Sequence, residues 1–169
     1  MSETRRGRKV WGIATLIAMG LATGLQAASG PEVKVRLNGS VQGHPAAGAA
    51  WVSLKDGTQV SPGEKILYRV DLINEGTQEA RKPMALGPVP AGTAFVPGTA
   101  SVGPGLKVDY SIDGGKTFSE KPTITATGKD GRPQIVPAPA DRYTTIRWTW
   151  GTSLAAGATA SASYQVQVR

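Results

Sequence analysis

Residues 65–73 read Lys-Ile-Leu-Tyr-Arg-Val-Asp-Leu-Ile and lead into the turn residues Asn74, Glu75 and Gly76. Successive side chains of a β-strand point to opposite faces, so this stretch divides its residues into two sets. One face is apolar and holds Ile66, Tyr68, Val70 and Leu72. The other face is mixed and holds Leu67, Arg69, Asp71 and Ile73. The pattern predicts a strand of an antiparallel sheet with one face in a core and the other partly solvated.

Further stretches have the length and composition of strands, and Gly- and Pro-rich segments separate them. They are residues 32–37, 50–54, 78–86, 106–112, 143–150 and 159–168. Residues 38–49 are rich in Gly, Pro and Ala and are expected to form a loose connection. No stretch after the leader sustains the apolar period of a helix. The sequence therefore predicts an all-β fold, an immunoglobulin-like antiparallel β-sandwich, with a small barrel as the alternative.

Residues 1–29 have the organisation of a secretory signal peptide. A basic start over residues 5–9 precedes the uncharged apolar residues 10–25. This apolar run is shorter than the ~20 residues that a membrane-spanning helix needs. Small residues follow it, and cleavage after Ala27 and cleavage after Ser29 both fit. We therefore expect a signal peptide helix that is cleaved, and a mature chain that is periplasmic or extracellular and free of the membrane.

Composition narrows the class of protein further. About 140 residues remain after cleavage, which is enough for one domain with its own core. The chain has no cysteine, so the fold relies on apolar burial, and a lipoprotein anchor, which needs a cysteine, is excluded. The chain has 19 basic and 12 acidic residues, and removing the leader's four and one leaves 15 against 11, a net charge of +4. These charges are interspersed, so nucleic acid is not an expected partner.

Two longer segments carry a family resemblance. Residues 60–76 combine a Pro-Gly turn, the strand around Tyr68 and an Asn-x-Gly turn. Residues 89–102 read Val-Pro-Ala-Gly-Thr-Ala-Phe-Val-Pro-Gly-Thr-Ala-Ser-Val, and a Trp-bearing strand, Leu-x-x-Gly and an alternating strand close the chain. In these motifs the chain resembles the conserved repeat domain of bacterial surface proteins (domain of unknown function eleven). The resemblance covers about residues 56–169 and implies an immunoglobulin-like spacer or adhesive module without shared catalytic residues. Residues 30–55 would then supply N-terminal strands and a flexible connection.

Residues 111–118, Ser-Ile-Asp-Gly-Gly-Lys-Thr-Phe, match the Asp-box pattern Ser-x-Asp-x-Gly-x-Thr-aromatic of secreted β proteins. The pattern is typical of a hairpin in which Asp113 accepts hydrogen bonds from loop amides and the glycines take positive φ. The alternative is a weak ligand or Ca²⁺ contact that involves Asp109 and Asp113. These two carboxylates are too few for a calcium cage, so we predict no metal site.

Trp148 and Trp150 lie two residues apart on an expected strand and therefore share a face. On an exposed sheet the two rings would form a platform on which a sugar stacks. Packing in the core is the favoured interpretation, because two exposed indoles on one strand promote aggregation. Trp51 lies in a short apolar stretch and is expected in the core for the same reason.

His44 is the only histidine and lies in the segment Gly-His-Pro-Ala. Catalytic triads and zinc sites hold a histidine through a second group, and this segment offers none. We interpret His44 as an inert surface residue. We expect no catalytic residue, no metal and no cofactor, and we predict that the protein is not an enzyme.

These observations favour an exported module with a structural or protein-interaction role at the cell envelope or outside the cell. The alternative is a carbohydrate-binding module that takes a glycan on a Trp148/Trp150 platform, with Asp113 as a further ligand contact. A third hypothesis, a hydrolase at the Asp box, requires a pocket with a second carboxylate close to Asp113.

We expect the mature chain to begin between Ala28 and Gly30, because the apolar run ends at Leu25 and small residues follow directly. N-terminal sequencing of the exported protein measures this. A mature chain that keeps residues 10–25 would contradict cleavage and leave the protein anchored.

Overall fold

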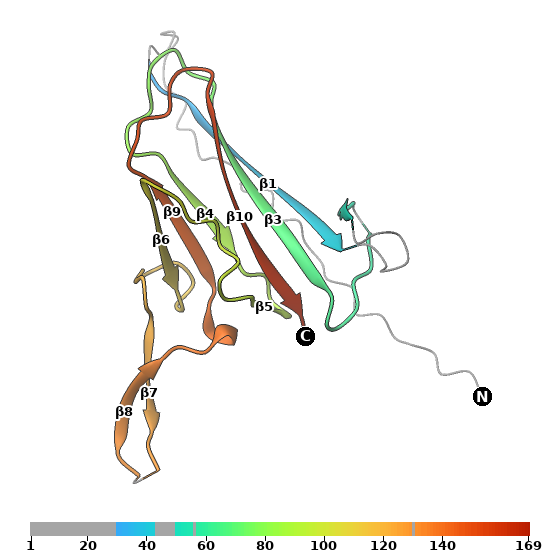
Figure 1. Cartoon of the computed structure of the whole chain (residues 1–169), viewed down its shortest axis with the longest axis vertical. Helices are drawn as coiled ribbons and strands as arrows, with labels where there is room; N and C mark the ends of the chain where they lie inside the picture. The colour runs from blue at the N-terminus through green and yellow to red at the C-terminus, as the bar shows by residue number, and fades with distance from the viewer. Residues whose placement is uncertain (1–29, 43–49, 56, 130) are drawn as a thin grey trace, which may run out of the picture.

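The computed structural model describes residues 30–42, 50–55, 57–129 and 131–169. The expected signal peptide and His44 lie outside these residues. The strands are β1 (Val33–Gln42), β2 (Trp51–Ser53), β3 (Lys65–Asn74), β4 (Met84–Pro88), β5 (Thr93–Phe95), β6 (Leu106–Ser111), β7 (Thr123–Thr127), β8 (Pro133–Pro137), β9 (Thr145–Trp150) and β10 (Thr159–Val168), with the short 3₁₀ helix η2 (Ala140–Arg142). The described chain is nearly all β with antiparallel sheets (Figure 1), which confirms the predicted sandwich-like fold.

The larger sheet has the strand order β2-β1-β3-β10-β5. Its central strand β3 contains the predicted strand at residues 65–73 and extends to Asn74. β3 pairs along its length with β1 on one side, from Val41 opposite Ile66 to Val33 opposite Asn74. On the other side it pairs with β10, from Gln167 opposite Lys65 to Thr159 opposite Ile73.

The smaller sheet has the order β4-β9-β6 and packs against the larger one. In its middle strand, Trp148 lies between Ala85 of β4 and Val108 of β6. Its indole ring packs against Tyr164 of the larger sheet, with ring centroids 5.6 Å apart. The Tyr164 hydroxyl donates a hydrogen bond to the carbonyl of Pro88, so the two sheets share a polar contact as well.

The core lies between the two sheets, as the alternation in β3 predicts. Ile66, Val70 and Leu72 are buried, and Tyr68 is half-buried and stacks on Tyr164. Gly87 of β4 permits this packing: a Cβ at that position would lie 2.6 Å from the Tyr164 ring and 2.8 Å from the Trp148 ring. A larger residue there would push the two sheets apart.

Asn74 ends β3 and is buried with every polar group bonded. Its side-chain amide donates to the carbonyl oxygens of Gln78 at 2.7 Å and Leu154 at 2.9 Å, and its Oδ1 accepts from the Gly76 amide at 3.1 Å. Its backbone bonds the segment 157–158 in both directions. One side chain therefore joins the end of β3 to the turn after it and to the segment before β10.

Three predicted features were wrong. Residues 38–42 are not a loose connection, because β1 continues to Gln42 in register with β3. Residues 78–83 form no strand, and only an isolated bridge between Ala80 and Leu154 precedes β4. Trp51 is not in the core: it lies opposite Gln42 on the edge strand β2 and is 37% exposed.

The β7–β8 hairpin and the short strand β5 escaped prediction. The hairpin residues are Thr, Ala, Pro, Gln and aliphatics without a long apolar run, so the usual strand signal is weak. The hairpin forms a separate two-stranded sheet that projects from the body as an arm (Figure 1). None of the described segments is a helix of the length and hydropathy needed to cross a bilayer.

We expect Asn74→Asp to lower the free energy of unfolding by about 3 kcal/mol. A carboxylate cannot donate to the two carbonyl oxygens, and its negative charge would be buried next to them. Urea unfolding followed by tryptophan fluorescence measures the change. The control is Asn38→Asp, the same replacement at an exposed position of β1, which we expect to change stability by less than about 0.5 kcal/mol. Equal effects of the two substitutions would show that the Asn74 amide is dispensable.

Candidate functional site

The three predicted site residues belong to neighbouring elements of the smaller sheet. Asp113 lies in the loop after β6, and Trp148 and Trp150 lie on β9, which pairs with β6. The tryptophans and Asp113 do not come together in one site, however. The tryptophans pack towards the core, whereas Asp113 organises a loop at the surface.

Trp148 is fully buried, and its indole N–H donates to the carbonyl oxygen of Ser101 at 3.1 Å. Trp150 is partly buried and packs against the same core. A sugar-stacking platform needs exposed ring faces, and Trp148 offers none. The favoured core interpretation of Trp148 is therefore confirmed, and the two rings do not form the platform that was considered as the alternative.

The Asp-box loop is held together by the Asp113 carboxylate. Oδ1 accepts hydrogen bonds from the Ser111 hydroxyl at 2.7 Å and from the amides of Lys116 and Thr117 at 3.0 and 2.9 Å. Oδ2 accepts from the Thr117 hydroxyl at 2.6 Å. Gly114 and Gly115 take φ of +77° and +87°, which turns the loop amides towards these acceptors. The hairpin interpretation of the Asp box is confirmed at the level of geometry.

These bonds favour the ionised form of Asp113. The Thr117 hydroxyl, followed by the Thr117 amide and the Ser111 hydroxyl, holds the pKa of Asp113 far below its usual range. A carboxylate with both oxygens engaged by its own loop is a poor general base and has little capacity left for a ligand. The geometry therefore favours a structural role for this residue.

Asp109 is the nearest acidic residue along the chain and is 3% exposed. Its Oδ2 accepts from the Arg147 guanidinium at 2.8 Å, and its Oδ1 lies 3.3 Å from the Lys107 ammonium. Burial acts to raise the pKa of Asp109, but the hydrogen bonds from Arg147 and Lys107 outweigh it and lower the pKa. Arg147 in turn lies over the Phe118 ring at 4.2 Å, so the Asp-box aromatic covers this ion pair.

Asp109 and Asp113 therefore do not form an acid–base pair in which one carboxyl is held neutral, because the pKa values of both are lowered. Within the described residues, no group of three or more His, Asp or Glu side chains could hold a metal ion. The weak Ca²⁺ contact considered for these two residues gains no support from this arrangement.

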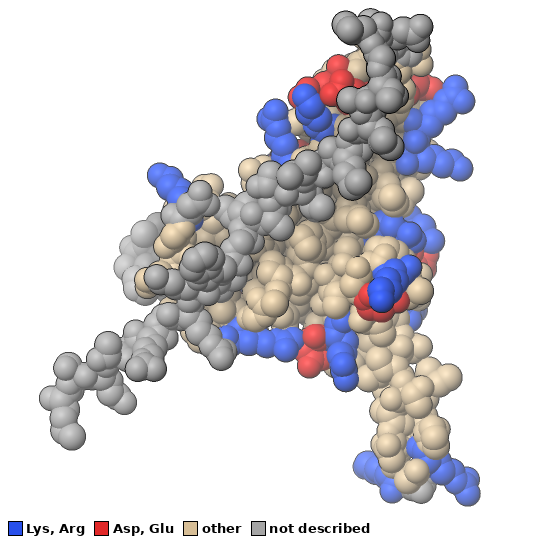
Figure 2. All heavy atoms as spheres, turned by 180° about the vertical axis from the view of Figure 1, so that it is seen from behind, with Lys and Arg blue, Asp and Glu red and all other residues tan. Residues whose placement is uncertain are grey.

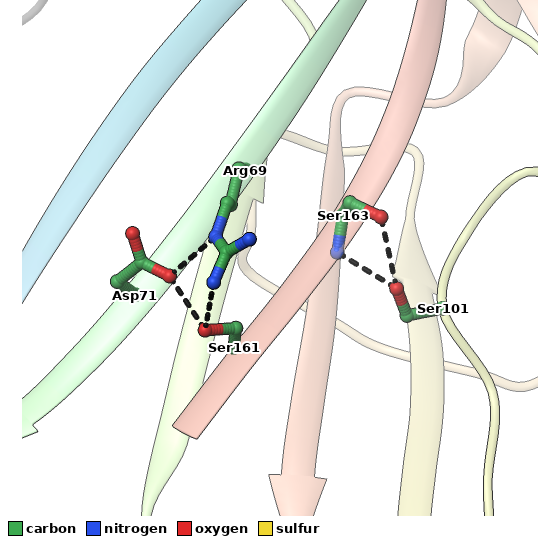
Figure 3. A network of polar contacts seen from close by, with 5 residues as sticks. All are labelled: Arg69, Asp71, Ser101, Ser161 and Ser163. Atoms are coloured by element: carbon green, nitrogen blue, oxygen red, sulfur yellow. Dashed lines mark hydrogen bonds and ion pairs between the residues drawn. The ribbon is translucent and has the colours of Figure 1, made fainter. Parts of the chain in front are cut away.

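A further polar network lies on the outer face of the larger sheet and was not predicted (Figure 3). Arg69 Nε donates to Asp71 Oδ1 at 2.8 Å, and Arg69 Nη2 donates to the Ser161 hydroxyl at 3.0 Å. Ser161 donates to the same carboxylate oxygen at 2.6 Å. Burial alone would raise the pKa of Asp71, but the bonds from Ser161 and Arg69 lower it. Alternation places Arg69 and Asp71 on one face, yet only the register of β10 against β3 brings Ser161 to them.

This network has a nucleophile and a carboxylate but lacks the arrangement of a catalytic site. An arginine donates to the serine oxygen, which withdraws electron density from the atom that would attack, and the carboxylate is a weak base at its lowered pKa. The network is a cross-strand clasp between β3 and β10.

Figure 3 also shows Ser101 beside Ser163 of β10. The Ser101 amide donates to the Ser163 carbonyl at 2.8 Å, and the Ser101 hydroxyl accepts from the Ser163 amide at 2.8 Å. In the same way, the Thr99 hydroxyl accepts from the Gln165 amide at 3.0 Å. Hydroxyl groups thus take the place of strand carbonyls and close part of the β10 edge.

No protein family model, curated protein or solved structure matches the chain. The resemblance to the bacterial surface-protein repeat therefore remains an expectation from the motifs at residues 60–76 and 89–102.

The pKa values of Asp71, Asp109 and Asp113 are all lower in the folded chain than the ~3.9 of an unfolded aspartate. The stability that they contribute is therefore complete above about pH 4 and is lost as the pH falls through the folded pKa values. We expect the urea midpoint to fall steadily between about pH 4 and pH 2.

Asp113→Asn tests the share of the Asp box. We expect this variant to lose stability at neutral pH and to show a shallower fall in the urea midpoint in acid. The reason is that it lacks one of the three carboxylates whose pKa is lowered by folding. Asp141→Asn, at an exposed aspartate in η2, is the matched control. An acid dependence that is unchanged by Asp113→Asn would contradict the assignment.

Proposed function

We propose that the chain is an exported, non-enzymatic β-sandwich module that binds protein partners at the cell envelope or outside the cell. The leader over residues 1–29 supports export. The observation that carries the binding role is the large amount of strand edge that the sandwich leaves unpaired by other described strands.

The first such edge belongs to β1. β2 pairs with β1 only from Ser40 to Gln42, so the rest of β1 has β3 on one side and no described strand on the other. Val35 shares the inner face with Leu72 but is 47% exposed. The second is the projecting β7–β8 arm, in which Ile135 is 78% exposed. Open strand edges and exposed aliphatic side chains are the features by which sheets take up other chains.

Two observations support this function over the alternatives. Trp148 is buried, so the carbohydrate platform has lost one of its two rings. The acidic and hydroxyl groups that hydrolysis would require are engaged in the Asp-box loop, the Asp109–Arg147 pair and the clasp between β3 and β10. An interaction role needs none of these groups to be free.

Photo-crosslinking in intact cells tests the proposal. A photoreactive amino acid is placed singly at Val35 on β1, at Leu86 on the outer face of the smaller sheet and at Thr125 on the arm. We expect irradiation to give protein adducts of defined mass at one or two of these positions, with unirradiated cells as the control. Adducts at none of the positions, in an exported and folded protein, would contradict a protein-binding function.

A further inference from the structure

The β7–β8 arm is built differently along its two edges. It projects beyond the smaller sheet, and Figure 2 shows an uncharged shaft with basic side chains at the tip. β7 and β8 pair only with each other. An isolated two-stranded hairpin is marginally stable in water, so an arm of this kind gains from a third strand.

The hydrogen bonds at the ends of the arm show which backbone groups face outwards. The Gly128 amide donates to the Arg132 carbonyl at 2.8 Å, and the Ala138 amide donates to the Pro122 carbonyl at 2.9 Å. Backbone groups alternate along an antiparallel pair. The backbone N–H and C=O groups of even-numbered residues on both strands therefore point towards the other strand of the hairpin. Those of odd-numbered residues point outwards, away from the hairpin.

On β8 the outward residues are Pro133, Ile135 and Pro137. Proline has no N–H, so this edge retains a single outward donor, and the two pyrrolidine rings obstruct an approaching strand. On β7 the outward residues are Thr123, Thr125 and Thr127. Each keeps its N–H and its carbonyl, and all three side chains are exposed. One edge of the arm is closed by proline and the other is open.

The charges around the open edge indicate what would occupy it. Lys121 and Lys129 flank β7, one at each end, and both are exposed. No charged residue lies on β7 between them. On β1, by contrast, Lys34 and Arg36 already pair with Glu75. Glu120, the described acidic residue beside Lys121, is paired with the Lys107 ammonium at 3.6 Å. The open edge of β7 thus presents an uncharged strand with a lysine at each end.

We propose that β7 takes up an extended acidic segment of a partner protein as an additional strand. This inference rests on the proposed protein-binding function and adds the binding site and the chemistry of the partner. The segment would pair with the outward groups of Thr123, Thr125 and Thr127 and place carboxylates near Lys121 and Lys129. Its alternate residues would be apolar, since the opposite face of β7 carries the half-buried Ile124 and Ala126.

A second copy of the chain fits this edge poorly. Antiparallel pairing of two β7 strands about Thr125 brings the Lys121 end of one copy beside the Lys129 end of the other. Like charges at both ends oppose that pairing, whereas an acidic segment removes the repulsion.

The experiment uses the mature protein and the peptide acetyl-Glu-Val-Thr-Ile-Thr-Val-Thr-Val-Glu-amide, followed by amide NMR. We expect the amide signals of Thr123, Thr125 and Thr127 to shift on titration and to become protected from hydrogen exchange. The same peptide with lysine at both ends is the charge control, and we expect it to bind at least about ten-fold more weakly. Binding of both peptides with equal affinity, or shifts confined to β1, would overturn the proposal.

A pair of proline substitutions tests the edge. Thr125→Pro removes the central outward N–H of the open edge without removing a bond to β8, and we expect it to weaken binding by about ten-fold or more. Ile135→Pro makes the same change on the closed edge and should leave the affinity unchanged. Equal affinity of the two variants would reject β7 as the binding edge.

Charge reversal covers the case in which Thr125→Pro disrupts the arm. The double variant Lys121→Glu, Lys129→Glu leaves the backbone alone and should prefer the lysine-ended peptide to the glutamate-ended one. An unchanged preference would overturn the proposal. Sedimentation that shows concentration-dependent dimers, lost in Thr125→Pro, would assign the edge to a second copy instead.

The in-cell cross-links separate this inference from the function on which it rests. Adducts at Val35 or Leu86 with none at Thr125 would reject the arm and leave protein binding in place. The absence of adducts at every position would reject both.

Discussion

The structure depends on β3 being paired along both of its edges while one of its faces is buried. β1 and β10 take up its backbone groups on the two sides, and Ile66, Val70 and Leu72 fill the core below it. Asn74 then binds the end of the strand to the turn after it and to the segment before β10. With the position of β3 determined in this way, the register of its neighbours follows, because a one-residue slip would turn every apolar side chain of β1 or β10 to the wrong face.

The same register explains why Asp71, Asp109 and Ser161 are poor candidates for catalytic groups. Cross-strand neighbours on an outer face lie close enough to bond one another, and here they do: Arg69 and Asp71 with Ser161, and Asp109 with Arg147. Each carboxylate with a lowered pKa owes it to donors that the fold itself provides. No buried side-chain polar atom of the described residues lacks a partner. This pairing of polar groups with one another supports the proposal that backbone edges and apolar side chains, rather than these polar groups, contact a partner.

Sequence reasoning succeeded where one physical pattern dominated and failed where two competed. The alternation in residues 65–73 predicted the core face of β3, and the spacing of Ser111, Asp113 and Thr117 predicted the hydrogen bonds of the Asp box. Trp51 was wrongly predicted in the core because an aromatic residue in an apolar stretch is usually buried. It lies instead on the three-residue edge strand β2, whose residues are all exposed to solvent. Residues 38–42 were missed because their composition is that of a loop, and the pairing offered by β3 outweighs it. The clasp at Ser161 and the ion pair at Asp109 depend on register, which no local pattern encodes.

A β-sandwich must protect the open edges of its sheets from aggregation or use them for binding. β10 is covered at one edge by β5 and by the hydroxyl groups of Thr99 and Ser101, which replace missing strand carbonyls. β1 bears Lys34 and Arg36 on its solvated face, and charged residues on an edge discourage aggregation. β8 has prolines at both ends of its outward edge. β7 has neither charged residues nor prolines along its outward edge, whose residues are threonines, which are good strand formers and keep every donor. Two prolines on one edge of a hairpin and three threonines on the other direct strand addition to a single side, and this selectivity distinguishes a binding edge from an aggregation hazard.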